Sequence, residues 1–233
     1  MKKISLLLLS LFITLSFINI GCSGKIPSEV KKNLSEVRTN IYEATNDNIS
    51  VNIITGQREE PYVLNGTAEG MNDYTVITII PENPDNISAD ITYNYFLKTG
   101  KKDYSGSFTL HPFGNSYAAE ISEKINVNSV ELKVTATKDD WNFNESLVME
   151  SILTENMINW EDALLIGMNT LKDSISPMYN KKDLKAEVYV KLLCDPLGKT
   201  SDHYWYVAFA DGKKIASALI DPISKEILAL REE

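Results

Sequence analysis

Few residues of this chain could act as a nucleophile or a base. It has two histidines and two cysteines, and hydrolysis by a serine or cysteine nucleophile needs a base beside that nucleophile. His111 precedes a proline and His203 precedes an apolar segment, and neither lies in a nucleophile motif. Cys194 is more typical of a small buried apolar residue than of a nucleophile. The two histidines and Cys194 also lack the usual ligand spacing of a zinc site, because His111 lies far from the other two in the sequence. We therefore expect no catalytic residue, cofactor or metal.

The carboxylates offer a second kind of chemistry. Adjacent acidic pairs such as Asp139-Asp140 and Glu59-Glu60 could bind calcium or act together in glycoside hydrolysis. The chain holds 32 Asp and Glu residues, so chance pairs are unavoidable. We therefore interpret these pairs as solvated turns.

Cys22 differs from Cys194 because it ends the first hydrophobic run. That run, Ile4 to Ile20, follows two lysines and is short for a membrane span, which needs about 20 apolar residues. The stretch Asn19-Ile20-Gly21-Cys22 resembles the lipobox of bacterial lipoprotein signal peptides, although an aliphatic residue is usual where Asn19 stands. The resemblance implies a signal peptide over residues 1–21, cleavage before Cys22, and a fatty-acylated (diacylglyceryl, palmitate-type) sulfur.

This resemblance also implies a location. The mature chain would be anchored by lipid to the cell membrane, in the cell envelope and facing outside the cytoplasm, because two acyl chains give stable attachment. An ordinary secreted protein and an uncleaved N-terminal membrane helix are the alternatives. Loss of the two lysines in residues 1–21 would change the formal net charge from -9 to -11. Such an acidic chain is a poor partner for nucleic acid.

Residues 22–44 should combine the anchor, a short polar tether and an amphipathic helix. Apolar residues recur at steps of four, three and four, which is typical of one helical stripe: Val30, Leu34, Val37 and Ile41. We expect a helix from Ser28 to about Ala44. Its stripe should pack on the neighbouring domain, and pairing with a partner helix is the alternative.

Residues 45–155 change to an alternating pattern. Apolar residues recur at every second position in a series of short segments separated by turn signals, with Val130 to Ala136 the clearest. This pattern predicts an antiparallel β-sandwich of immunoglobulin-like architecture. The segment Tyr62 to Asn65 is a short candidate strand, and Glu145 to Leu153 fits a strand or a helix.

Residues 156–233 should form a small α+β domain. Asn159 can cap a helix that carries Glu161 and Asp162 in its first turn, and strands follow to the end of the chain. The segments Glu161-Asp162-Ala163, Tyr206-Val207-Ala208-Phe209 and Ala218-Leu219-Ile220-Asp221-Pro222, followed by Ile227-Leu228, resemble the PepSY domain family. The family's usual glycine after the Asp-Pro step is replaced by Ser224-Lys225-Glu226. The resemblance implies a non-catalytic domain that binds or restrains peptidases.

Three tyrosines carry the remaining signal for function. Alternation places Tyr204 and Tyr206 on one face of their strand, and Tyr189 on the matching face of its own strand. If open, this face suits a protein or peptide partner; otherwise it packs on the β-sandwich. We therefore expect a non-catalytic binding or regulatory protein. A carboxylate-based or metal-assisted hydrolase of cell-wall material and a solute-binding lipoprotein are the alternatives.

Overall fold

The computed structural model describes residues 24–62, 70–138, 141–194 and 202–232. The hydrophobic run, Cys22, the Asp139-Asp140 pair and residues 63–65 of the candidate strand after Tyr62 lie outside these ranges. None of the helices among the described residues is both long enough and apolar enough to cross a membrane.

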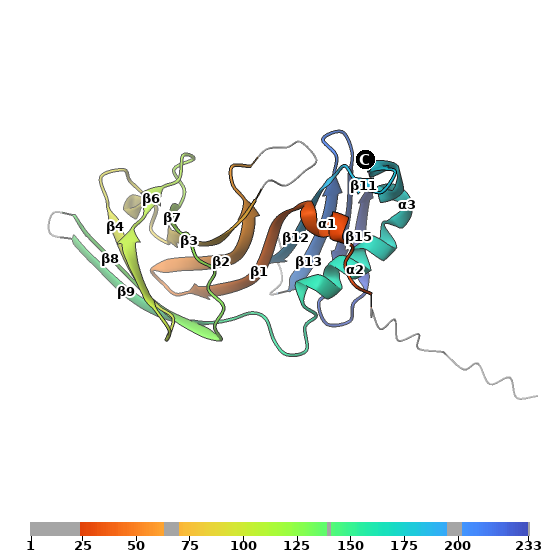
Figure 1. Cartoon of the computed structure of the whole chain (residues 1–233). Helices are drawn as coiled ribbons and strands as arrows, with labels where there is room; N and C mark the ends of the chain where they lie inside the picture. The colour runs from red at the N-terminus through yellow and green to blue at the C-terminus, as the bar shows by residue number, and fades with distance from the viewer. Residues whose placement is uncertain (1–23, 63–69, 139–140, 195–201, 233) are drawn as a thin grey trace, which may run out of the picture.

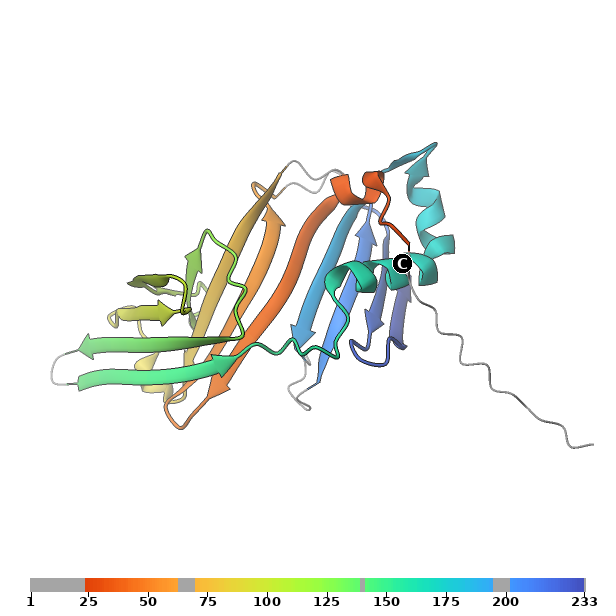
Figure 2. The same ribbon diagram turned by 60° about the horizontal axis from the view of Figure 1, so that its bottom comes forward.

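The described residues are mostly β-structure, in two large sheets. The nine-stranded sheet has the spatial order β15 (Ile227–Glu232), β14 (Ile215–Ile220), β13 (His203–Ala210), β12 (Glu187–Cys194), β1 (Leu34–Thr45), β2 (Ile49–Glu59), β3 (Met71–Pro81), β7 (Tyr117–Ile121) and β6 (Thr109–Leu110). The four-stranded sheet has the order β5 (Asp103–Ser107), β4 (Tyr93–Lys98), β8 (Ser129–Lys138) and β9 (Trp141–Glu150). Figures 1 and 2 show the four-stranded sheet at one end of the longer sheet.

Short elements complete the described structure. The α-helices are α1 (Ser28–Lys32), α2 (Trp160–Thr170) and α3 (Lys172–Ile175), and the 3-10 helices are η1 (Pro84–Asn86) and η2 (Ser176–Met178). A two-stranded ribbon pairs β10 (Tyr179–Asn180) with β11 (Asp183–Leu184). The mainly β class and the large antiparallel sheets are consistent with the predicted β-sandwich.

The described residues form two apolar cores, one between the two sheets and one between helix α2 and the nine-stranded sheet. Between the two sheets, alternate residues of the strands pack together, among them Ile77, Tyr93, Tyr117 and Leu132. At the other end, α2 packs on one face of β12, β13 and β14, where Trp205 and Val207 are fully buried. The Trp205 indole N–H donates to the Ile158 carbonyl oxygen over 3.0 Å. The predicted cap of this helix is confirmed, because the Asn159 side chain accepts from the Asp162 amide.

The predicted helix from Ser28 to about Ala44 is wrong beyond its first turn. Helix α1 ends at Lys32, and β1 begins at Leu34. All four residues of the proposed stripe are nevertheless buried: Val30, Leu34, Val37 and Ile41. The pairing of β1 shifts register between Leu34 and Glu36 and again between Arg38 and Asn40, and such irregularities break strict alternation. A spacing that resembled a helix is therefore accommodated in a strand that has neighbours on both sides.

Strand β1 also connects the two predicted domains. It pairs antiparallel with β2 and parallel with β12, so one sheet runs from residues 45–155 into residues 156–233. The segment Glu145 to Leu153, which fitted either strand or helix, is strand as far as Glu150. This continuous sheet places β1 between β2 and β12. The segment after β2 reaches β12, where the Tyr62 and Tyr189 hydroxyls lie 2.7 Å apart, and this arrangement builds the site described next.

Candidate functional site

The three predicted tyrosines lie on one face of β12 and β13. The register pairs Tyr206 with Lys191, Tyr204 with Leu193, and Tyr189 with Ala208. Their neighbours Trp205 and Val207 face the opposite side, where α2 packs. None of the three tyrosines is buried in the structure. We call Tyr189, Tyr204 and Tyr206 the tyrosine face.

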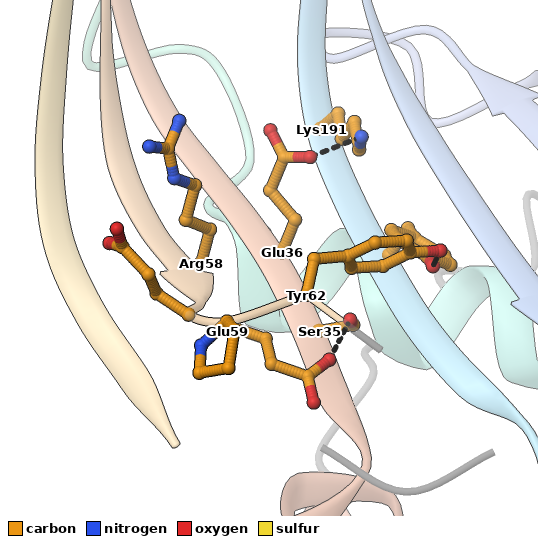
Figure 3. Close-up of a pocket in the computed structure, with 9 residues that line it drawn as sticks. Ser35, Glu36, Arg58, Glu59, Tyr62 and Lys191 are labelled. Atoms are coloured by element: carbon orange, nitrogen blue, oxygen red, sulfur yellow. Dashed lines mark hydrogen bonds and ion pairs between the residues drawn. The ribbon is translucent and has the colours of Figure 1, made fainter. Parts of the chain in front are cut away.

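A pocket of 660 Å³ adjoins the tyrosine face at Tyr189. Its walls come from the start of β1, the end of β2 and the middle of β12, together with residues 60–62 (Figure 3). The cis peptide bond between Glu60 and Pro61 lies in the segment that follows β2. Lys191 lines this pocket as well, so the pocket and the tyrosine face share strand β12.

A partly buried carboxylate, that of Glu36, links β1 to β12 in the wall of the pocket. Glu36 forms an ion pair with Lys191, as Figure 3 shows, and a second with Arg38 at 3.3 Å. The Tyr74 hydroxyl donates to the same carboxylate over 2.8 Å. Burial alone would raise the pKa of Glu36, but attraction to Lys191 and Arg38 outweighs it and lowers that pKa. Burial, with the charge of Glu36 nearby, raises the pKa of Tyr74 to about 12.

Tyr189 is held in place by a second carboxylate. Its hydroxyl donates to Glu187 Oε2 over 2.5 Å and lies 2.7 Å from the hydroxyl of Tyr62. Burial is the main cause that raises the pKa of Tyr189, and its hydrogen bonds to Glu187 and Tyr62 raise that pKa further. The phenol therefore stays neutral near pH 7 and serves as a hydrogen-bonding and apolar contact group rather than as a base.

The Glu59-Glu60 pair differs from the solvated turn expected for it. Glu59 is only 2% exposed at the end of β2, and its carboxylate accepts a hydrogen bond of 2.7 Å from the Ser35 hydroxyl (Figure 3). Glu60 is exposed. The two carboxylates therefore have different surroundings, although both line the pocket.

The residues considered for nucleophilic chemistry fall into two places. Cys194 and His203 are direct partners where β12 meets β13, whereas His111 follows β6, the last strand at one edge of the nine-stranded sheet. Burial and the neighbouring Glu43 raise the pKa of the Cys194 thiol to about 12. The thiol is thus protonated near neutral pH and is a weak nucleophile.

Sequence reasoning did not find the pocket. Its wall residues on β1, Ser35 and Glu36, were assigned to a helix, and their approach to Lys191 requires the parallel pairing of β1 with β12. Comparison of the chain with protein-family models, curated proteins and solved structures gave no match.

Proposed function

We propose that this chain is a lipid-anchored protein of the cell envelope that binds a protein or peptide partner through the tyrosine face and the adjoining pocket. The observation that carries the proposal is the incomplete burial of all three tyrosines on the side of β12 and β13 opposite α2. Tyrosine combines an apolar ring with a polar tip and is enriched at protein interfaces. The resemblance of residues 159–231 to the PepSY family, whose members bind or restrain peptidases, supports the same role.

The charges of the pocket suggest which partner it would accept. Its two cations are compensated, because Lys191 pairs with Glu36 and Arg58 pairs with Glu120 at 2.8 Å. Glu60 forms no ion pair with any residue that the structure describes. A partner segment that offers a lysine or arginine side chain to the pocket would complement this excess of negative charge.

A small-molecule role is the second candidate, and a second pocket favours it. This pocket of 310 Å³ is lined by Trp141 and by asparagines of the β1–β2 turn, η1 and β9. Amide side chains beside an aromatic ring suit a polar solute. A thermal shift produced by one metabolite of a panel and abolished by Trp141→Ala would favour solute binding over a macromolecular partner.

The lipid anchor gives a prediction that mass spectrometry can check. The protein recovered from membranes should begin at Cys22 and carry acyl mass on that residue, because residues 19–22 match the lipobox at the last three positions. Cys22→Ser should prevent acylation and lower the membrane-bound fraction. A mature protein with residues 1–21 attached, or one lacking acyl mass at Cys22, would contradict the anchor.

The tyrosine face gives a second prediction. In capture experiments from solubilised membranes, the full-length Tyr204→Ala/Tyr206→Ala variant should lose binding of the specific partner by about 30-fold, which corresponds to about 2 kcal/mol for two interface aromatics. The matched control is Tyr104→Ala, since Tyr104 is also only partly buried but lies on β5 of the other sheet.

Two outcomes would contradict a binding role for the tyrosine face. Equal capture by wild type and the double variant, with both proteins folded, would exclude the tyrosine face as the binding surface. Turnover of a cell-wall polymer that is lost on Glu59→Gln would instead favour the carboxylate-based hydrolase.

A further inference from the structure

Three side chains with metal-binding atoms converge where the ends of three strands meet. Glu43 lies on β1, Cys194 ends β12 and His203 begins β13. One ligand atom from each residue lies within 4.8 Å of the others. The Cys194 thiol donates to Glu43 Oε1 over 2.6 Å, and His203 Nε2 lies 3.6 Å from Glu43 Oε2. This cluster is separate from the pocket, whose lining includes none of the three residues.

One nitrogen of the His203 imidazole is unsatisfied by hydrogen bonding within the described part of the chain. Its Nε2 atom is buried and has no hydrogen-bond partner among the residues that the structure describes, and the side chain is 14% exposed. Buried polar atoms are normally satisfied, and leaving one unsatisfied costs free energy. A cation between Nε2 and the Glu43 carboxylate would satisfy both groups at once.

The dimensions of the cluster fit a small cation. In a tetrahedral zinc site, bonds of about 2.0–2.3 Å place the ligand atoms about 3.3–3.8 Å apart. The separation of His203 Nε2 from Glu43 Oε2 is already in this range. The closer Glu43 carboxylate and Cys194 sulfur would have to separate by about 1 Å. The Glu43 side chain is 38% exposed, so there is room for this movement.

Asn52 contacts two of the three side chains and would hold them in place around a metal ion. Its side-chain amide donates to Glu43 Oε1 over 2.7 Å and also lies 3.9 Å from the Cys194 sulfur. Hydrogen bonds of this kind orient metal ligands and commonly change metal affinity 10- to 100-fold.

We propose that Glu43, Cys194 and His203 form a binding site for a late divalent transition metal, with Zn²⁺ as the first choice. A thiolate, an imidazole and a carboxylate suit Zn²⁺, whereas Ca²⁺ and Mg²⁺ prefer oxygen ligands alone. On binding, the Cys194 S–H bond breaks, a sulfur–metal bond forms and the proton leaves to solvent. The three protein ligands leave a fourth tetrahedral position for water or for a group from a partner.

The test is metal titration of the purified, full-length protein after removal of metals with a chelator. Zn²⁺ alone should bind with a 1:1 stoichiometry and a dissociation constant of about 1 µM or lower by calorimetry. Co²⁺ in place of Zn²⁺ should give tetrahedral visible bands and a thiolate-to-cobalt charge-transfer band. Cys194→Ser and His203→Gln should each weaken Zn²⁺ binding at least about 100-fold, and Asn52→Ala about 10-fold.

The control is His111→Gln, which removes the only other histidine of the chain and should leave the affinity unchanged. Wild-type protein that shows no thiolate-to-cobalt band, or that binds Zn²⁺ only above about 100 µM, would overturn the site. The same holds if folded Cys194→Ser and His203→Gln bind as tightly as wild type. The wild-type cobalt spectrum decides the question even if a variant fails to fold.

Discussion

Gly56→Ala is expected to lower the free energy of unfolding by about 3–4 kcal/mol, one of the two largest effects that we expect here. A Cβ atom on Gly56 would lie 2.0 Å from the Val37 carbonyl oxygen and 2.9 Å from the Cα of Arg38. Both atoms belong to the backbone of β1, close to its register shift between Arg38 and Asn40. No side-chain rotation can relieve this overlap, so β1 and β2 would have to separate.

Chemical denaturation of wild type and variant measures this effect. The matched control is Gly70→Ala, because a Cβ on Gly70 meets no atom of the described residues within 4 Å. Since β1 connects β2 with β12, the loss should appear in the unfolding of the whole nine-stranded sheet. Equal midpoints for Gly56→Ala and Gly70→Ala would show that β1 does not pack against β2 in this way.

Glu36→Gln should cost about 2–3 kcal/mol at pH 7, because it leaves Lys191 and Arg38 without their shared carboxylate. The lowered pKa of Glu36 sets the pH dependence of this effect. A carboxyl whose pKa is lower in the folded state stabilises the fold above its unfolded pKa of about 4.3, and this contribution is lost as the pH falls through the folded pKa. The difference between wild type and variant should therefore be full at pH 6–7 and shrink below about pH 4.

Denaturation midpoints across this pH range provide the measurement. Glu131→Gln is the matched control, because Glu131 pairs with Lys98 on the exposed surface of the four-stranded sheet, where ion pairs contribute little. A difference between wild type and Glu36→Gln that does not change with pH would mean that shape, and not charge, accounts for the role of Glu36.

Much of the strand content could be predicted from the sequence, because strands with one buried face show a period of two. The segment Val130 to Ala136 is an example, since its alternate residues are buried as expected. The stripe of Val30, Leu34, Val37 and Ile41 was predicted wrongly for a physical reason. The prediction that these four residues are buried is confirmed. The register shifts that let a strand bury residues at uneven spacing depend on partner strands distant in the sequence, so the spacing alone could not reveal a strand.

The candidate sites depend even more on long-range pairing. Alternation placed Tyr189, Tyr204 and Tyr206 on one face, because this follows from local strand geometry. The approach of Glu43 to Cys194 and His203 could not be predicted, because it requires both the β12–β13 register and the parallel neighbour β1. Because Glu43 lies about 150 residues before Cys194 and His203, the sequence gives no sign that the sheet brings their ligand atoms together.

Site-specific photo-crosslinking tests the proposed binding role most directly. A photoreactive phenylalanine analogue at Tyr206, in the full-length protein in its own membranes, should give one discrete crosslinked species that contains a protein partner. The same analogue at Tyr104, on the other sheet, should not give this species. Absence of any crosslink from position 206, or the same species from both positions, would contradict the proposal that the tyrosine face binds a partner.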